Sequence, residues 1–235
     1  MTGAPELKLG PVTEGRGFVV VLPGGGYRLR AEHETTPPLD WLAARGWRAG
    51  ALPYTVDPAP YPLPLAELLG ALADVRAGRY GAVEGPVGVL GFSAGGHLAG
   101  LAATATPDEL AAADSGAARP DFAVLAYPVV SLVRHPHLGS RAALLADRAD
   151  EPGLAERLSL ESRVDAATPP VFAWTTADDE TVDARNSLLL AARLVEHRVP
   201  VELHVLPNGA HGLGMAPEAA WRPAARWLER IREPR

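Results

Sequence analysis

The sequence predicts an α/β fold in which a mostly parallel sheet of about six to seven strands is flanked by helices. Short continuous apolar runs, which fit strands buried on both faces, alternate with segments whose apolar residues recur at helical spacing. Glycine and proline are frequent but fall at the boundaries of these segments. Because no linker or internal repeat divides the 235 residues, we expect one domain over residues 1–235.

Six segments have the pattern of buried strands. The first is an apolar run, residues 17–22, that ends in Pro23 and three glycines, as expected for a parallel strand followed by a tight turn. In chain order, the predicted strands are residues 17–22, 47–56, 86–92, 122–126, 171–175 and 201–206.

The segments between these strands have helical patterns. Pro37 and Pro38 fit the first turn of a helix, and the closing segment is amphipathic, with Trp221 and Trp227 on its apolar face. The proline-rich stretch 57–64 is predicted as an extended loop, and residues 138–158 as short helices. The predicted longer helices are residues 39–45, 65–77, 94–105, 184–197 and 217–231.

Composition and charge argue against several classes of protein. The net charge of −6, with no cluster of Lys and Arg, argues against a nucleic-acid partner. The absence of cysteine excludes disulfides, thiolate metal sites and a cysteine nucleophile. We see no secretory signal and no apolar run long enough to span a membrane, so we expect a cytoplasmic protein.

The segment Gly91-Phe92-Ser93-Ala94-Gly95 matches the pattern G-x-S-x-G between a predicted buried strand and a predicted helix. In this context the serine sits on a strained turn that exposes its hydroxyl, and small neighbours permit the close approach of the two elements. The bland alternative is a glycine-rich turn with an incidental serine. We interpret Ser93 as a nucleophile.

Three consecutive glycines follow the first predicted strand, at Gly24-Gly25-Gly26. Glycines let backbone N–H groups approach the oxyanion of a tetrahedral intermediate. We expect the N–H groups of Gly25, Gly26 and Ala94 to form the oxyanion hole. A nucleotide-binding loop is the alternative, but no G-x-G-x-x-G or G-K-[ST] pattern follows.

An acid and a base are expected at the ends of later strands. Asp178 and Asp179 follow the strand that ends near Thr175, at the edge where open α/β sheets place their sites. His211 lies on a glycine-flanked loop and completes the chain order Ser, Asp, His. We interpret His211 as the general base. His97, on the helix after Ser93, is predicted to be structural.

With these residues in place, the sequence resembles the small, capless α/β-hydrolases of the acetylesterase and acetylxylan-esterase type. These are related to the feruloyl-esterase-like and hormone-sensitive-lipase-like branches. The latter branch carries His before its three glycines, where this chain has Pro23; this departure argues against assigning the chain to that branch but leaves the expected catalysis unaffected. The motifs that carry the resemblance are Pro23-Gly24-Gly25-Gly26-Tyr27, His33-Glu34, Tyr54-Thr55-Val56, Gly91-Phe92-Ser93-Ala94-Gly95-Gly96-His97, Tyr127-Pro128-Val129, Gly139-Ser140, Thr168-Pro169-Pro170, Ala177-Asp178-Asp179 and Gly209-Ala210-His211-Gly212.

The resemblance implies that Asp178, the first acid of the pair, orients His211, and that Asp179 is solvated or caps a helix. It also implies an α/β-hydrolase sheet trimmed at its N-terminal edge, since only residues 7–9 offer a strand before residue 17, and no cap domain. Four residues beside the oxyanion loop and the serine turn are candidates for the substrate pocket, with packing as the equal alternative: Tyr27, His33, Glu34 and Phe92.

These residues and the resemblance together predict a serine esterase that needs no cofactor or metal, since His135-x-His137 reads as a polar loop. Its expected substrate is a small-molecule ester, a short-chain and specifically acetyl ester of a carbohydrate or similar alcohol. The alternatives are an arylformamidase or related amidase on the same fold, and a non-catalytic binding protein.

Overall fold

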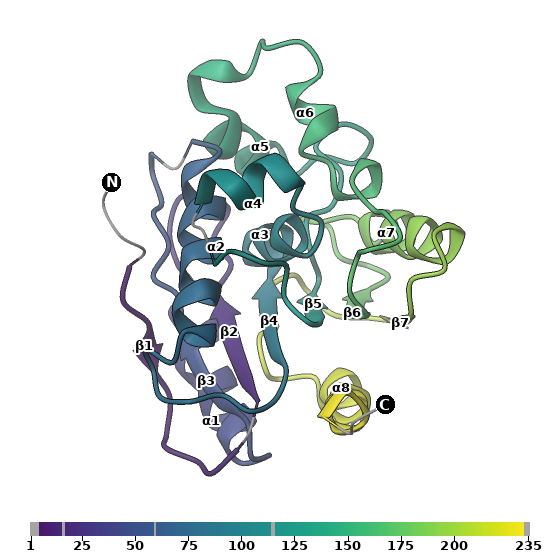
Figure 1. Ribbon diagram of the computed structural model, residues 1–235. Helices are drawn as coiled ribbons and strands as arrows, with labels where there is room; N and C mark the ends of the chain where they lie inside the picture. The colour runs from purple at the N-terminus through teal and green to yellow at the C-terminus, as the bar shows by residue number, and fades with distance from the viewer. Residues whose placement is uncertain (1–4, 16, 59, 114–115, 233–235) are drawn as a thin grey trace.

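Seven strands form one sheet in the computed structural model, which describes residues 5–15, 17–58, 60–113 and 116–232 (Figure 1). The strand order across the sheet is β1-β3-β2-β4-β5-β6-β7. The strands are β1 (Lys8–Leu9), β2 (Phe18–Leu22), β3 (Arg48–Ala51), β4 (Val87–Phe92), β5 (Ala123–Ala126), β6 (Val171–Thr176) and β7 (Val201–Leu206).

All neighbouring strands are parallel except β1, which pairs antiparallel with β3 at the edge. In the described part of the chain, this two-residue strand alone precedes β2, as the sequence predicted. The α/β class, the mostly parallel sheet and its shortened first edge are therefore confirmed.

Helices cover both faces of the sheet. Helices α2 (Leu63–Arg76), α3 (Ser93–Ala103) and α7 (Arg185–Glu196) pack on one face, while α1 (Thr36–Ala43) and α8 (Glu218–Arg232) pack on the other (Figure 1). Successive side chains of a strand point to opposite faces. In β2, Phe18, Val20 and Leu22 join the first core, whereas Val19 and Val21 join the second. This burial on both faces explains the continuous apolar runs.

The remaining helices are short and lie in connections. They are α4 (Pro107–Ala113), α5 (Leu138–Leu145), α6 (Leu154–Arg157) and the 3₁₀ turns η1 (Glu32–Glu34), η2 (Ala146–Arg148) and η3 (Leu160–Ser162). Helices α5 and α6, between β5 and β6, are the short helices expected over residues 138–158. Within the described ranges, no helix has the length and apolarity that crossing a membrane requires.

Two elements differ from the prediction. The strand predicted over residues 47–56 ends at Ala51. The last hydrogen bond to the neighbouring strand runs from the N–H of Leu52 to the carbonyl of Val21. Pro53 follows and has no N–H to continue the ladder. Helix α4 was not predicted at all.

The topology sets where a site can form. Strands β2 and β4 are neighbours, but the chain leaves β2 toward β3 on one side and leaves β4 toward β5 on the other. Open α/β sheets bind ligands at such a switch point, beyond the carboxyl ends of the strands. The loops after β2 and β4 carry Gly24–Gly26 and Ser93, so both meet at this edge.

Candidate active site

Ser93 occupies a strained turn between β4 and α3. Its φ of 52° lies in the left-handed region that a non-glycine residue rarely adopts. The turn leaves no space beside it: a Cβ on Gly91 would lie 2.3 Å from the carbonyl oxygen of Gly95. A Cβ on Gly95 would lie 2.2 Å from that of Leu22. The glycines of the G-x-S-x-G pattern are thus required by close backbone contact.

His211 lies within hydrogen-bond distance of Ser93, on the loop between β7 and α8. Its Nε2 is 2.7 Å from Ser93 Oγ, and its Nδ1 is 2.7 Å from Asp179 Oδ2. An ionised carboxylate only accepts, so Nδ1 carries a proton and donates it to Asp179. In the neutral ring Nε2 is then the acceptor for the Ser93 hydroxyl. The ring also packs edge-on against Tyr127, with centroids 5.0 Å apart.

The structure pairs His211 with Asp179, so the expectation that Asp178 orients the histidine is wrong. The Asp178 carboxylate points elsewhere and accepts a hydrogen bond from the N–H of Gly209, at 2.7 Å. Two adjacent residues in a turn after a strand direct their side chains differently, and here the second one is the inward-facing residue. Asp178 instead fixes the start of the loop that carries His211.

The surroundings of Asp179 keep its carboxylate ionised. Its side chain is fully buried, which alone would raise its pKa. Hydrogen bonds from His211 and from the backbone N–H groups of Val182 and Thr181 outweigh that effect and hold the pKa below its usual value. The charge that would stabilise a protonated His211 is therefore built into the fold.

The glycine loop after β2 faces Ser93. Gly25 and Gly26 have φ values of 125° and 66°, and among the described residues neither N–H group donates to another backbone carbonyl. The preceding N–H, of Gly24, donates to the buried carboxylate of Glu34 at 2.7 Å, which anchors the loop. Ala94 follows Ser93 in the first turn of α3, where helix geometry leaves N–H groups unpaired.

A pocket of about 470 Å³ opens over Ser93 and His211. Of the four predicted pocket residues, His33 and Glu34 line it. Tyr27 and Phe92 do not; both are fully buried, so their prediction as pocket residues is wrong. The remaining lining residues are Gly25, Gly26, Arg28, Leu29, Ala31, His137, Gly139, Thr181 and Gly212.

Tyr27 and Phe92 support the site from beneath. The Tyr27 hydroxyl lies 2.9 Å from Nδ1 of His97, whose Nε2 donates to the carbonyl of Leu158 at 2.8 Å. Burial lowers the pKa of His97 to about 4, so it stays neutral. As predicted, His97 thus packs inside the protein, while Phe92 stacks between Tyr127 and Trp221.

Tyr127 was not predicted as a site residue, although it belongs to one of the family motifs and contacts Glu34, Gly214 and His211. Its hydroxyl donates to Glu34 at 2.6 Å and accepts from the N–H of Gly214 at 2.8 Å. Burial, and then the charge of Glu34, raise its pKa, so it remains a neutral donor. Its position at the end of β5, at the same sheet edge, was the available signal.

Arg28 and His137 also line the pocket, and neither was predicted to do so; His137 was predicted to lie in a polar loop. The Nδ1 atom of His137 lies 2.8 Å from the Ser140 hydroxyl.

The described residues include no metal-binding cluster: no group of three or more His, Asp or Glu side chains is arranged to hold a metal ion.

The family model for the prolyl oligopeptidase family matches residues 75–231, which include Ser93, Asp179 and His211. The chain therefore belongs to the prolyl oligopeptidase family. This assignment agrees with the resemblance to α/β-hydrolases.

Several relatives of this prolyl oligopeptidase family member are known. It is 35% identical over 213 residues to endo-1,4-β-xylanase B of Butyrivibrio fibrisolvens, covering 86% of this chain and 33% of the relative. It is 28% identical over 229 residues to the acetylxylan esterase of Xylanibacter ruminicola, covering 92% of this chain and 46% of that protein. The chain thus spans a third to a half of the length of these curated relatives.

Among solved structures, the acetyl ester-xyloside bifunctional hydrolase of Caldicellulosiruptor lactoaceticus is similar at 39% identity and a TM-score of 0.85. The match covers 94% of this chain and 85% of that chain. A sugar hydrolase of Lactococcus lactis is similar at 28% identity and a TM-score of 0.75, covering 94% and 92% of the two chains.

Proposed function

We propose that this protein is a serine esterase that hydrolyses short-chain, specifically acetyl, esters of carbohydrates or similar alcohols. The observation that carries the proposal is the continuous hydrogen-bonded chain from Ser93 through His211 to the buried Asp179, with 2.7 Å at each step. Such a chain activates a serine hydroxyl as a nucleophile.

In the first step, Ser93 Oγ attacks the ester carbonyl while Nε2 of His211 takes the hydroxyl proton. Asp179 holds the tautomer that keeps Nε2 free to accept, and it stabilises the imidazolium that forms. The oxyanion is stabilised by the N–H groups of Gly25, Gly26 and Ala94. The imidazolium then protonates the leaving alcohol, which leaves Ser93 acylated.

In the second step, His211 removes a proton from water, which attacks the acyl group, and the return of the proton to Ser93 releases the acid. Every proton in this cycle passes through Nε2 of His211. Water is the only reactant that this scheme needs besides the ester and the side chains named.

The proposed substrate class rests on the relatives and on the shape of the site. Proteins named acetylxylan esterase and acetyl ester-xyloside hydrolase are similar to this chain over most of its length. The segment between β5 and β6 holds short helices and contributes His137 and Gly139 to the pocket, rather than a large cover. An open site of this kind suits a small acyl group on a bulky alcohol.

The direct test is hydrolysis of p-nitrophenyl esters from acetate to decanoate by the wild type and by Ser93→Ala. We expect the wild type to prefer acetate, and the variant to lose activity while its circular dichroism and melting temperature stay unchanged. Acetylated xylo-oligosaccharides and acetylated monosaccharides would then be compared as substrates.

N-formyl aromatic amines, measured beside the acetate ester, distinguish esterase from amidase activity. A higher kcat/KM on the formamides than on the acetate ester would contradict the ester preference. It would leave Ser93, His211 and Asp179 in their proposed roles. A folded wild type that cleaves neither class would contradict catalysis altogether and favour the binding-protein alternative.

Two further parts of the proposal concern the setting. We propose that residues 1–235 act as one hydrolase domain and that the protein resides in the cytoplasm. Fractionation of the source cells tests the second statement.

A further inference from the structure

The pocket over Ser93 presents hydrogen-bond donors and positive charge, because the carboxylates beside it already accept hydrogen bonds from other groups of the protein. Glu34 is 2% exposed, and its oxygens accept from Gly24 N–H and from the Tyr127 hydroxyl. Asp179 is likewise buried and accepts from His211 and two backbone N–H groups. Glu34 also lies 3.7 Å from Nε2 of His33, but among the described residues neither carboxylate forms an ion pair with Arg28.

His137 presents one N–H group to this pocket. The backbone N–H of Ser140 donates to its Nδ1 at 3.2 Å, so Nδ1 is an acceptor and the neutral ring carries its proton on Nε2. Burial, followed by the nearby charges of His211 and Arg28, lowers its pKa and keeps it neutral. Among the described residues, Nε2 has no hydrogen-bond partner.

His137 also lies beside the glycine loop. A Cβ built on Gly26 would sit 3.7 Å from Cε1 of His137 and 3.8 Å from the Ser140 hydroxyl. The imidazole is held as the N-cap of α5, which fixes its direction. The unpaired donor is therefore a rigid part of the pocket wall next to the proposed oxyanion hole.

Arg28 supplies the charge. It lines the same pocket two residues after Gly26, and within the described part of the chain its guanidinium forms no hydrogen bond or ion pair. Arg30 differs, because its guanidinium donates to the carbonyl of Tyr54 at 2.7 Å. An unpaired guanidinium beside a catalytic serine matches a planar carboxylate, which it binds through two N–H groups.

We propose that Arg28 and His137 form a subsite for a carboxylate on the alcohol portion of the ester substrate. The assignment to the alcohol portion rests on the proposed function, since an acetyl group fills little of a 470 Å³ pocket. Arg28 forms the ion pair, and the Nε2–H of His137 donates a further hydrogen bond. The preferred substrate class is thus an acetyl ester of an acidic sugar or another acidic alcohol.

The test compares 4-acetoxybenzoate with 4-acetoxybenzamide, two aryl acetates of similar size that differ in charge. We expect Arg28→Gln to lower the ratio of kcat/KM for 4-acetoxybenzoate to kcat/KM for 4-acetoxybenzamide about tenfold or more. The change should come mainly from a higher KM for the anionic ester. Arg28→Lys should restore part of that ratio. His137→Asn, which keeps a side-chain acceptor for the N-cap, should lower the ratio by a smaller factor.

Arg30→Gln is the matched control, because it removes the same charge from the same loop outside the pocket lining. An equal fall in the ratio for Arg30→Gln and Arg28→Gln would overturn the subsite and indicate a general field effect. An unchanged ratio in Arg28→Gln would overturn it as well.

A binding measurement separates this proposal from the esterase proposal. In Ser93→Ala, calorimetry should show tighter binding of 4-hydroxybenzoate than of 4-hydroxybenzamide, and adding Arg28→Gln should abolish the difference. If the wild type cleaves no ester but this difference holds, the esterase proposal fails and the subsite stands. If esters are cleaved and the two compounds bind equally, the subsite is wrong and the esterase proposal stands.

Discussion

At the scale of single residues, the site depends on which of two adjacent carboxylates turns inward. Asp179 is fully buried against His211, whereas Asp178 is exposed and holds Gly209 at the base of the same loop. The two residues are adjacent in the sequence and carry the same side chain. Their effects on catalysis should therefore differ sharply.

We expect Asp179→Asn to lower kcat on p-nitrophenyl acetate by about 10²–10⁴-fold, because the amide no longer fixes the productive tautomer of His211. Asp178→Asn should lower it less than about tenfold, since the asparagine oxygen still accepts from Gly209. Steady-state kinetics of the two variants check both statements. The reverse order of effects would restore Asp178 as the orienting residue.

At the scale of elements, two local features fix where a helix begins: close backbone contact in the turn before α3, and side-chain capping at the start of α4. The turn requires glycine because backbone atoms of the two elements touch. Helix α4 begins with a capping box, in which Thr106 Oγ1 accepts from the N–H of Glu109 and the Glu109 carboxylate accepts from the N–H of Thr106. The pattern T-x-x-E was readable in the sequence, so this helix could have been predicted.

We expect Gly95→Ala to destabilise the protein by about 1–3 kcal/mol, and to reduce activity further by displacing Ser93. The added methyl would lie 2.2 Å from Leu22 O and 2.5 Å from Pro23 O, where a backbone shift is needed. Gly116→Ala is the control, since its nearest neighbour would be a methyl group at 3.8 Å. Urea unfolding measures stability, and ester hydrolysis reports the site. Equal stability of both variants would refute the close-packing argument.

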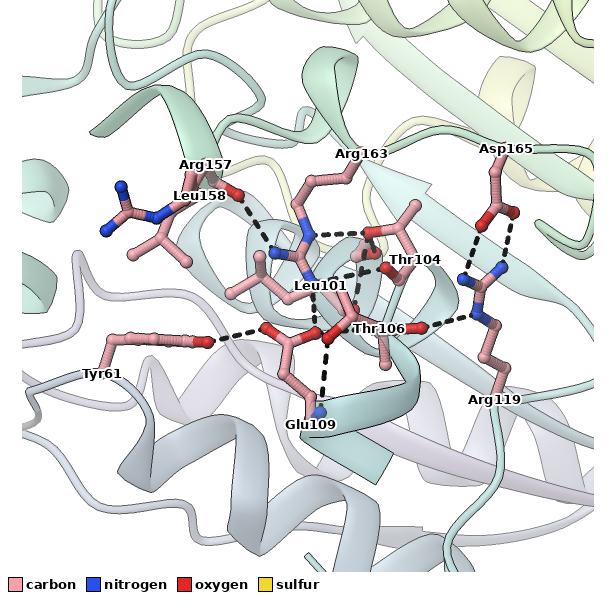
Figure 2. Close-up of polar contacts among 12 residues, drawn as sticks. Tyr61, Leu101, Thr104, Thr106, Glu109, Arg119, Arg157, Leu158, Arg163 and Asp165 are labelled. Atoms are coloured by element: carbon pink, nitrogen blue, oxygen red, sulfur yellow. Dashed lines mark hydrogen bonds and ion pairs between the residues drawn. The ribbon is translucent and has the colours of Figure 1, made fainter. Parts of the chain in front are cut away.

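At the scale of the whole molecule, a largely buried ion pair joins segments far apart in the chain. Arg163, after η3, pairs with Glu109 of α4 at 2.5 Å, and the two side chains are 7% and 11% exposed (Figure 2). The guanidinium also donates to Thr104 and to the carbonyl of Arg157. Tyr61, just before α2, donates to Glu109 at 2.7 Å, and the pairing helps raise the pKa of its already half-buried hydroxyl to about 12.

We expect Arg163→Met to lower the free energy of unfolding by about 3–5 kcal/mol, because it leaves the Glu109 carboxylate buried without its cation. The double variant Arg163→Met with Glu109→Gln should recover part of that loss. Asp74→Asn, which weakens a pair with Arg79 whose guanidinium is largely exposed to solvent, should cost less than about 1 kcal/mol. Denaturant unfolding at neutral pH compares the variants, and a loss for Arg163→Met as small as for Asp74→Asn would contradict the role of this pair.

The same pair predicts a direction for acid sensitivity. Burial raises the pKa of Glu109, but hydrogen bonds from Thr106 and Arg163 outweigh burial and lower it from 4.5. The contribution of Glu109 is therefore present above that pH and is lost as the pH falls below it.

The sequence by itself determined the fold class, the order of the strands and of the longer helices, and the identity of Ser93 and His211 as the pair that meets. These features follow from local patterns: apolar runs, helical spacing, and glycines where the backbone must approach closely. The tertiary structure alone decided between Asp178 and Asp179, and it placed Tyr27 and Phe92 beneath the pocket and Arg28 and His137 in its wall. Those outcomes depend on the direction of single side chains relative to distant segments, which spacing along the chain does not specify.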